Sequence, residues 1–241
     1  MIIPTYNERE NIIPRSGGER DPSHYGILDA VHTHLPQADI LVIDDGSPDG
    51  TAQIVKERMK KDSRLFIIER PGKLGLGTAY IRGFQWAVEN GYDYAFEMDA
   101  DFSHDPRDLP SFVEQLEDGA DLVIGSRYIP GGEVVDWPKK RKLLSRYANI
   151  YARFVTGTPI RDLTAGYKCY HTEIFRQIRL DNISADGYGF QIEIDYRVWL
   201  AGFKVREIPI TFKDRRLGVS KLNRRIVWQA LFLVPQLRLW R

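Results

Sequence analysis

The sequence predicts an α/β fold in which a mainly parallel sheet is flanked by helices. Short β-branched apolar runs alternate with segments of helical periodicity through the first half of the 241-residue chain. That alternation is typical of βαβ units, whose crossovers place helices on both faces of a sheet. Hydrophobic residues make up 43% of the chain, enough for an ordinary buried core. Ligands of such sheets bind beyond the carboxyl ends of the strands, so the polar residues there are candidates for function.

The elements of the first half follow one another in regular order. Strands are expected at residues 1–4, 40–43, 65–69, 94–98 and 122–125. Helices are expected between them at residues 25–34, 50–61, 78–90 and 109–118. The stretch 15–23, RSGGERDPS, is rich in glycine and charge and is expected to be an exposed loop.

The rhythm changes after about Tyr128. We expect a loop with a KKRK cluster at 129–142, a helix around 143–156, a mixed stretch, a helix at 190–201 and a strand at 205–211. No repeat or low-complexity linker separates the two parts of the chain. Residues 1–241 are therefore expected to form a single domain.

Composition excludes several kinds of partner and location. The 34 basic and 33 acidic residues nearly cancel, so no nucleic-acid partner is expected. The single cysteine, Cys169, can form neither an intrachain disulfide nor a zinc knuckle, which favours a reducing, cytoplasmic compartment. The first residues, MIIPTYNERE, have no signal-peptide features, so export is not expected.

The tail at residues 226–240 is the most apolar stretch of the chain. It falls short of the roughly 18 consecutive apolar residues of a membrane span, because Pro235 and several polar residues interrupt it. The tail could pack on the core as a terminal helix, or it could lie on a membrane surface. Both alternatives stay open at this point.

The run DADFSH at residues 99–104 directly follows the fourth strand. Asp99 and Asp101 are two apart, so in an extended segment their side chains would point to the same side. Two carboxylates in a cleft repel each other unless a cation compensates, and Mg²⁺ or Mn²⁺ usually adds waters and substrate phosphates to one or two carboxylates. The run therefore predicts a divalent metal and a phosphate-bearing ligand. The alternative is a solvated acidic turn before a helix near Pro106, for which Asp105 would suffice as the cap.

The loops after the first and second strands could serve the same site. The run IDDGSPDGT places Asp44 and Asp45 at a strand end, where a carboxylate could accept hydrogen bonds from a nucleobase or a ribose. A tight turn explains the glycine, serine and proline there, but it does not require two adjacent aspartates. In PTYNE, Tyr6 offers a surface for stacking and Glu8 an acceptor.

Basic residues follow three further strands. Lys73, with Gly75 and Gly77 before a helix, could approach an anion, although the Walker spacing is missing and close packing explains the glycines equally well. Arg127 follows the fifth strand in GSRY. The run FKDRRLGVSK supplies Arg215, Arg216 and Lys221. Arginine suits a bidentate grip on phosphate and lysine supplies a point charge, although each residue alone could be a solvated surface charge.

The order of these motifs is specific. PTYNE, IDDGSPDG, LGLGTAY, MDADFSH, GSRY, DLTAGYK, FQIEI and RRLGVSK together resemble the dolichyl-phosphate (polyprenyl-phosphate) mannosyltransferases over nearly the whole chain. These enzymes are a branch of the inverting GT-A glycosyltransferases of family 2. The resemblance implies a GT-A fold and metal-dependent transfer of mannose, with inversion, from GDP-mannose to a polyprenyl phosphate. Residues 1–128 would then be the nucleotide-sugar-binding half, and residues 129–241 the acceptor half.

The resemblance also implies roles for individual residues. Guanosine would be held by Pro4, Tyr6, Glu8, Ile43 and Asp45. The diphosphate, sugar and metal would be held by Asp99, Ala100 and Asp101, with Ser103 as an additional candidate for the Mg²⁺ or Mn²⁺ ion. The phosphates of donor and lipid would be bound by Arg127, Arg215 and Lys221. Gln191, Glu193 and Ser220 would lie on the sugar or acceptor side, and the catalytic set would be Asp99, Asp101 and Arg127.

The acceptor implied by the resemblance is a membrane lipid. We therefore expect peripheral attachment to the cytoplasmic face of a membrane, through the tail and through the basic loop WPKKRK at 137–142, with Trp137 at the interface. A solvated face is the alternative for that loop, and a small membrane-anchoring subunit is a further expected partner. Many relatives carry carboxy-terminal membrane helices, whereas no membrane span is expected within these 241 residues, and the stretch 15–23 departs from the family's usual helix.

Other functions remain open from sequence alone. The same fold and metal motif would serve another donor, such as UDP-glucose, or a non-lipid acceptor. A non-catalytic nucleotide-sugar-binding subunit is the alternative outside enzymes. A lipid phosphate is largely ionised at neutral pH, its second pKa being about 6 by analogy with phosphorylated side chains. Transfer to it would need no strong general base, in agreement with the lack of an evident serine or histidine nucleophile constellation.

Overall fold

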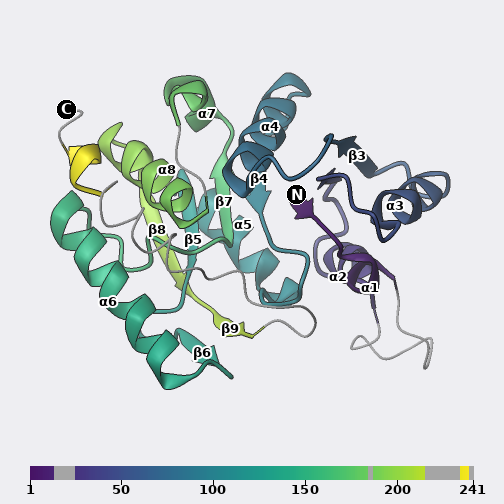
Figure 1. Cartoon of the computed structure of the whole chain (residues 1–241). Helices are drawn as coiled ribbons and strands as arrows, with labels where there is room; N and C mark the ends of the chain where they lie inside the picture. Colours follow the sequence, from purple (N-terminus) through teal and green to yellow (C-terminus); the bar gives the residue numbers. More distant parts are fainter. Residues whose placement is uncertain (14–24, 184–186, 215–233, 239–241) are drawn as a thin grey trace.

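A computed structural model of the chain describes residues 1–13, 25–183, 187–214 and 234–238 (Figure 1). The expected loop at 15–23 lies outside the described residues, as does most of the tail. Four residues expected to bind substrate or phosphate also lie outside them: Arg215, Arg216, Ser220 and Lys221.

The predicted mainly parallel sheet is confirmed. Seven strands pair in the order β3 (Leu65–Glu69), β2 (Ile40–Asp44), β1 (Ile2–Thr5), β4 (Tyr94–Glu97), β7 (Lys168–His171), β5 (Leu122–Ser126) and β8 (Val205–Pro209). All pairings are parallel except those of β7, which runs antiparallel to both β4 and β5. All five residues of β2 are buried, as expected for a parallel strand covered on both faces.

Alternate residues of each strand feed two hydrophobic cores, one on each face of the sheet. Ile2, Leu41 and Ile124 point into one core, and their neighbours Ile3, Val42 and Val123 into the other. The first core is covered by α4 (Leu76–Glu89), α6 (Lys139–Thr156), α7 (Glu173–Gln177) and α8 (Tyr188–Leu200). The second is covered by α1 (Arg9–Ile12), α2 (Ile27–His34), α3 (Thr51–Met59) and α5 (Leu109–Glu117).

The second half differs from its prediction in two places. The expected loop at 129–142 contains the strand β6 (Glu133–Val135), which pairs with β9 (Thr211–Lys213), and α6 already begins at Lys139. The KKRK cluster has no apolar periodicity, which is why the start of the helix escaped prediction. Strand β7 was hidden in the mixed stretch because it carries a buried lysine, Lys168, and shows no regular alternation.

Two short 3₁₀ segments complete the described elements: η2 (Pro106–Asp108), directly before α5, and η3 (Leu180–Asn182), after α7. None of the helices within the described ranges is both long and apolar enough to cross a membrane.

Candidate functional site

The loops that carry the predicted residues emerge at one edge of the sheet. β1, β2 and β4 are parallel neighbours, so their carboxyl ends lie side by side. β5 runs in the same direction, two places further along. The Thr5 hydroxyl at the end of β1 donates to Asp44 Oδ2 at the end of β2, over 2.9 Å. The sheet therefore brings together the loops that follow β1, β2 and β4.

The loop after β2 is held by its own aspartates. Asp44 is buried and accepts hydrogen bonds from Thr5, from the main-chain N–H of Ser47 at 2.9 Å and from the Ser47 hydroxyl at 2.6 Å. Asp49 accepts from the Thr51 hydroxyl at 2.6 Å and from the main-chain N–H of Arg9 at 3.1 Å. These bonds fix the turn and join it to the loop after β1.

Asp45, expected to contact guanosine, forms a buried ion pair with Arg70. Arg70 Nε donates to Asp45 Oδ1 over 2.6 Å, and the same guanidinium donates to the Thr78 hydroxyl and the Gly75 carbonyl. Asp45 is thereby joined to the first turn of α4. Arg70 was not predicted from the sequence, although a signal was available: a basic residue directly follows β3, which pairs with β2 and its acidic end.

The loop after β1 carries the side chains expected at the nucleobase. Lys73 Nζ lies 3.7 Å from the centroid of the Tyr6 ring, a cation–π contact that covers one face of the ring. Glu8 Oε2 accepts from Asn11 at 2.6 Å. Pro4 is half-buried, whereas the side chain of Ile43 is wholly inside the first core, so only its main chain could face a nucleotide.

The acidic run after β4 is a turn, and the expectation of an extended segment was wrong. β4 ends at Glu97, and Phe102 has a left-handed φ of 60°. Asp101 Oδ1 accepts from the main-chain N–H of Ser103 at 3.0 Å and also from the Ser103 hydroxyl. The turn, rather than alternation along a strand, sets the direction of the Asp101 side chain.

The helix cap that was the alternative explanation of this run is also present. Asp105 accepts from the main-chain N–H of Arg107 at 3.0 Å, and Pro106 occupies the first position of η2. Because Asp105 makes this cap by itself, the cap does not account for Asp99 and Asp101.

His104 and Ser103 connect the acidic turn to the second half of the chain. His104 Nδ1 accepts the main-chain N–H of Asp99 at 3.3 Å, and its ring stacks on Tyr167 with centroids 4.8 Å apart. The main-chain N–H of Lys213, in β9, donates to the Ser103 carbonyl at 3.3 Å. Burial, together with the Arg127 charge, lowers the pKa of His104 to about 4 against the opposing effect of Asp101.

A buried polar network lies beneath the acidic turn. Glu97 accepts from the Tyr170 hydroxyl and from Gln191 Nε2, both at 2.7 Å. Gln191 Oε1 accepts from Lys168 Nζ at 2.6 Å, and Lys168 pairs with Asp195 at 2.7 Å. Burial raises the pKa of Glu97, although Lys168 lowers it. Burial also raises the pKa of Asp195, to about 8, again against the effect of Lys168.

This network places Gln191 inside the protein, linking α8 to the end of β4. Glu193, also expected near the sugar, is buried and accepts from Arg197 at 2.7 Å. The sequence analysis missed Glu97, Lys168 and Asp195. The sequence did carry one signal for this network: Gln191 and Asp195 are four residues apart, so they lie on one face of a helix.

Tyr80 is a further residue that the sequence analysis missed. It lies in α4 with no exposed surface, and its ring stacks on Phe190 of α8 with centroids 6.1 Å apart. Burial, followed by the charges of Asp99 and Glu97, raises the pKa of Tyr80 well above its usual value. Tyr80 therefore lies beside the acidic turn.

Arg127 is held in a buried bidentate ion pair. Its Nε and Nη2 donate to the two carboxylate oxygens of Asp162 at 2.7 and 2.6 Å, and Nη2 also donates to the Thr164 hydroxyl at 2.8 Å. Burial would raise the pKa of Asp162, but the charge and hydrogen bonds of Arg127 hold it below its usual value. Asp162, missed from sequence, belongs to the run DLTAGYK.

The expected membrane contact of Trp137 is wrong, because its side chain is buried. Its ring lies 3.9 Å from the Arg141 guanidinium carbon and 5.3 Å from the Phe212 ring centroid. The Phe212 ring also packs edge-on against His104, at 5.4 Å. Trp137 thus joins α6 to the acidic turn.

The acidic turn has a donor set that fits a divalent ion. Asp99, Asp101 and Ser103 supply carboxylate and hydroxyl oxygens, the hard ligands that Mg²⁺ and Mn²⁺ take. No cluster of three or more His, Cys, Asp or Glu suited to a metal occurs among the described residues. A site here would thus depend on one or two carboxylates and on oxygens of a bound phosphate.

The chain is similar to proteins of a known glycosyltransferase family. The family described as "Glycosyl transferase family 2" matches residues 1–179. Polyprenol monophosphomannose synthase of Mycolicibacterium smegmatis is 46% identical over 237 residues, covering 98% of this chain and 85% of that protein. Undecaprenyl-phosphate mannosyltransferase of Micrococcus luteus is 44% identical over 235 residues, covering 98% and 91%.

Solved structures support the fold. Glucosyl-3-phosphoglycerate synthase from Mycobacterium tuberculosis, in complex with Mn²⁺ and UDP-glucose, has a TM-score of 0.65 at 18% identity, covering 98% of this chain and 77% of that one. The same enzyme with Mg²⁺ and UDP has a TM-score of 0.63 at 19% identity. These neighbours are GT-A glycosyltransferases, so the expected GT-A fold is confirmed. Because the family model matches residues 1–179, more than half of the chain, and the relatives are 44–46% identical over nearly all of it, the chain belongs to glycosyl transferase family 2.

Proposed function

We propose that the protein transfers mannose from GDP-mannose to a polyprenyl phosphate with inversion, giving a β-linked mannosyl phospholipid and GDP. The names of two relatives at 46% and 44% identity support the polyprenyl phosphate acceptor and the mannosyl group. The observation that carries the proposal is one of geometry. The acidic turn after β4 and the Arg127–Asp162 pair after β5 are joined through His104, Tyr167 and Phe212 at the edge of the sheet.

The donor would bind along the ends of β1, β2 and β4. Pro4, Tyr6, Glu8, the main chain of Ile43 and Asp45 would hold guanosine, with Arg70 fixing Asp45. Lys73 would leave the Tyr6 ring for a phosphate, or remain as a cation beside the base. Asp99, Ala100 and Asp101 would face the diphosphate and sugar, and Arg215 and Lys221 would add phosphate contacts.

Asp99 and Asp101, with Ser103, would hold Mg²⁺ or Mn²⁺, which when bound neutralises charge that develops on the leaving diphosphate. The chain's own contribution is positional. Ser103 and His104 orient the acidic turn, and Asp162 fixes the Arg127 guanidinium beside it. An arginine held in this way needs no reorganisation to stabilise negative charge.

The incoming nucleophile would be the lipid phosphate. It is ionised at neutral pH, so no side chain has to remove a proton from it. Alignment of the phosphate with the anomeric carbon is then the main requirement, and attack opposite the diphosphate inverts that centre. Gln191 and Glu193, which are internal, would support the sugar side through α8, and Ser220 would belong to the acceptor side.

The lipid acceptor makes peripheral attachment to the cytoplasmic face of a membrane part of the proposal. The tail at 226–240 and the basic start of α6 would contribute, and a small membrane-anchoring subunit would be a partner. The names of the relatives support a lipid acceptor, and the six basic residues and absence of acidic ones in α6 support contact with anionic headgroups.

The test is transfer of label into lipid. The protein would be incubated with radiolabelled GDP-mannose or UDP-glucose, a divalent metal and polyprenyl phosphate, and the organic phase then counted. We expect label from GDP-mannose, a β-linked product by NMR, and loss of transfer on chelation. Label from UDP-glucose instead, or transfer to a non-lipid acceptor, would replace the proposed reaction. Nucleotide-sugar binding without any transfer would indicate a non-catalytic subunit.

A further inference from the structure

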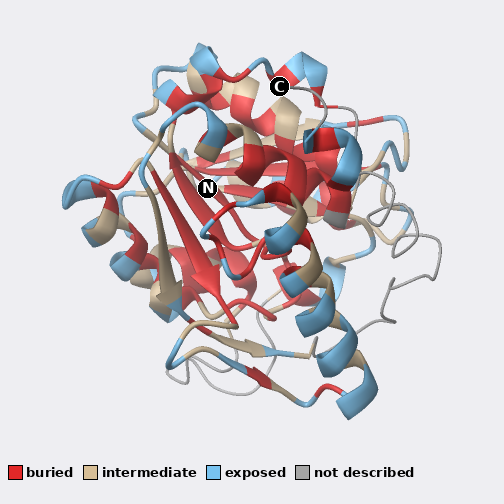
Figure 2. Ribbon diagram, turned by 90° about the vertical axis from the view of Figure 1, so that its left-hand side faces the viewer, coloured by how far each residue is buried: buried red, intermediate tan, exposed pale blue. Residues whose placement is uncertain are grey.

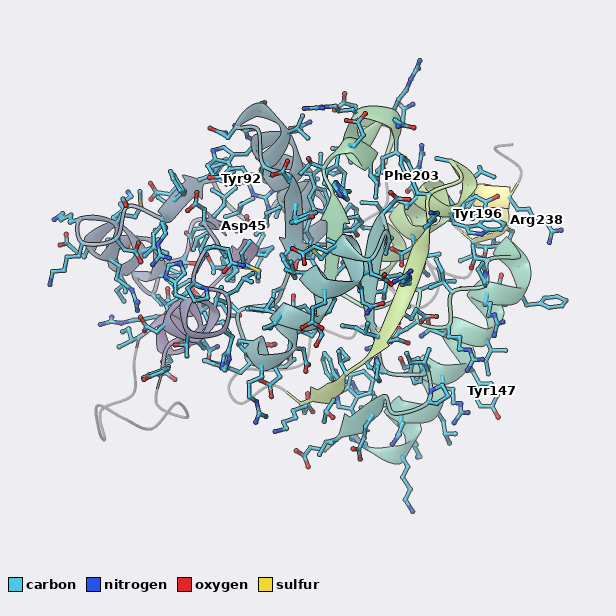
Figure 3. All side chains as sticks on the ribbon, turned by 180° about the vertical axis from the view of Figure 1, so that it is seen from behind. Asp45, Tyr92, Tyr147, Tyr196, Phe203 and Arg238 are labelled. Carbon is cyan, nitrogen blue, oxygen red and sulfur yellow. The ribbon has the colours of Figure 1, made fainter. Side chains whose placement is uncertain are left out.

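The outward face of α6 is apolar. Of the eight large hydrophobic side chains exposed among the described residues, five belong to this one helix: Leu143, Leu144, Tyr147, Ile150 and Phe154. Tyr147 is 66% exposed and Phe154 83%. Figure 2 shows that the outward side of α6 is largely exposed, and Figure 3 shows Tyr147 at the outer edge of the molecule. Contiguous apolar surface of this kind marks an interaction site.

The exposed side chains form one stripe. At about 100° per residue, Leu143, Tyr147, Ile150 and Phe154 fall within an arc of roughly 60° around the helix axis. Their spacing of four, three and four residues is that of a single helix face. We call these four residues, together with Leu144 beside them, the α6 stripe.

The opposite face of α6 fixes its orientation. Asn149 and Ala152 are buried there, and Asn149 Nδ2 donates to the Thr164 hydroxyl at 2.9 Å. The Tyr128 hydroxyl donates to the Ser145 hydroxyl at 2.7 Å. Turning the helix to bury the stripe would break both hydrogen bonds and leave the hydroxyls of Tyr128 and Thr164 without these partners. The stripe is thus held outward by the contacts of the Arg127 loop.

The charge of α6 indicates what covers the stripe. The helix contains six basic residues and no acidic ones, and four of the basic residues form its first turn: Lys139, Lys140, Arg141 and Lys142. Cations at a helix N-terminus oppose the helix dipole and destabilise the helix, and no side chain caps this end. Lys142, Arg146 and Arg153 are exposed and form a row along one side of the stripe. An anionic surface would relieve both the repulsion among the cations and the unfavourable dipole.

We propose that the α6 stripe inserts into the interface of an anionic lipid bilayer, with the basic row and the first turn of α6 contacting the headgroups. An apolar stripe bordered by lysine and arginine is the pattern of a helix lying in the plane of a membrane. The inference builds on the proposed function, in which the acceptor is a lipid. In this inference the α6 stripe makes the apolar membrane contact that was expected of Trp137, which is buried.

Docking in this way would place the site at the membrane surface. The first turn of α6 leads directly to the Arg127 loop, because Arg141 stacks on Trp137 and Trp137 lies 5.7 Å from the Arg127 guanidinium carbon. The surface that meets the headgroups and the arginine expected to meet the lipid phosphate are therefore parts of one packed unit. A lipid would not have to leave the bilayer fully for its phosphate to reach the site.

Vesicle co-sedimentation of the full chain tests the proposal independently of catalysis. The variant would combine Leu143→Gln, Tyr147→Gln, Ile150→Gln and Phe154→Gln, and Leu200→Gln in α8 would be the matched control, since Leu200 is an exposed apolar residue on another helix. With vesicles of phosphatidylglycerol and phosphatidylcholine, we expect the fourfold variant to bind at least tenfold more weakly than the wild type. The Leu200 variant should bind these vesicles as the wild type does. Both proteins should bind vesicles of pure phosphatidylcholine less well than the anionic vesicles.

Two outcomes would overturn the docking proposal. One is equal sedimentation of the wild type and the fourfold variant. The other is a wild type that sediments alone as a dimer, dissociates on the fourfold substitution and does not bind vesicles, which would assign the stripe to a second copy of the chain. Thermal unfolding of the variant checks that it is folded.

A kinetic comparison separates this inference from the proposed reaction. The fourfold variant should lose most transfer to a long polyprenyl phosphate in vesicles, yet keep transfer to a short, water-soluble isoprenyl phosphate. Vesicle binding without transfer to either acceptor would leave the docking surface intact and reject the proposed reaction. Equal loss with both acceptors would reject the docking role of the stripe.

Discussion

The loops after β2 and β4 are both acidic, but their carboxylates are held in different ways. After β2, Asp44 accepts from three donors and Asp45 pairs with Arg70. After β4, Asp101 accepts from Ser103 within its own turn. His104 closes this turn by accepting the main-chain N–H of Asp99, and the main chain of Lys213 ties the turn to β9.

The difference separates carboxylates that shape the protein from those at its chemistry. Asp44 is a structural residue whose donors would be unsatisfied without it. The described hydrogen bonds of Asp101 come from Ser103, two residues away in the same turn, so we expect its removal to cost less stability than removal of Asp44. The two loops should therefore respond oppositely to the same substitution, one mainly in stability and the other mainly in activity.

Replacing Asp101 with alanine should produce the largest effect. We expect transfer to fall by about 10³-fold or more, on the order of 4 kcal/mol of transition-state stabilisation, because a preorganised charge at the diphosphate is lost. Asp93→Ala, at an exposed aspartate just before β4, is the control and should keep full activity. Rates of labelled lipid formation measure the effect, and an Asp101→Ala enzyme with wild-type activity would contradict the metal assignment.

Replacing Asp162 with alanine extends the comparison to the loop of Arg127. Removing one partner of a buried ion pair leaves an uncompensated charge, so the free energy of unfolding should fall by roughly 3–5 kcal/mol. The pKa of Asp162 is lower in the folded protein, so its stabilising effect is full above its unfolded pKa of about 4 and is lost as pH falls through the lower folded value.

Denaturant unfolding of the wild type and of Asp162→Ala at several pH values measures this effect. The stability difference between them should be constant above about pH 5 and should shrink below about pH 4. A difference that grew on acidification would show that Asp162 is not an ionised partner of Arg127.

Replacing Asp44 with alanine tests the structural side of the comparison. Three hydrogen bonds would be broken and two buried or half-buried hydroxyl groups left without this acceptor, so we expect a loss of about 2–3 kcal/mol in the free energy of unfolding. Transfer measured below the unfolding temperature should fall far less than for Asp101→Ala. The comparison of the loops would fail if Asp44→Ala were as inactive as Asp101→Ala while fully stable.

Replacing Ser103 with alanine should have the smallest effect. The hydroxyl bonds to Asp101 but the main-chain N–H of Ser103 does so as well, so the turn should keep its shape. We expect a loss of about 0.5–1.5 kcal/mol, which is a rate lower by roughly twofold to thirteenfold. Titration of activity with Mn²⁺ would show whether the loss is one of metal affinity. A loss as large as that of Asp101→Ala would make Ser103 an essential ligand.

The sequence by itself determined the α/β class, the five parallel strands of the first half and the loops that carry the donor candidates. It could do so because buried parallel strands read as continuous apolar runs, and because turn residues mark the strand ends. It also identified Asp45, Asp101 and Arg127 from polar residue types at those ends. It did not identify Arg70 and Asp162, the partners of Asp45 and Arg127, because each of these pairs joins segments that only the folded sheet brings together.

Only the tertiary structure decided how the strands and helices of the second half are arranged. Strand β7 has no alternating pattern, because Lys168 faces a buried network built by α8 and β4. Helix α6 meets the protein through a mixed face, in which Asn149 and Thr156 are buried beside Ala152, and it exposes an apolar stripe that a soluble protein would usually bury. Periodicity reports that such a helix has two faces, but which face meets the protein depends on Ser145 and Asn149 finding partners on distant loops. That choice is made by packing, and it places the apolar residues of α6 on the outside.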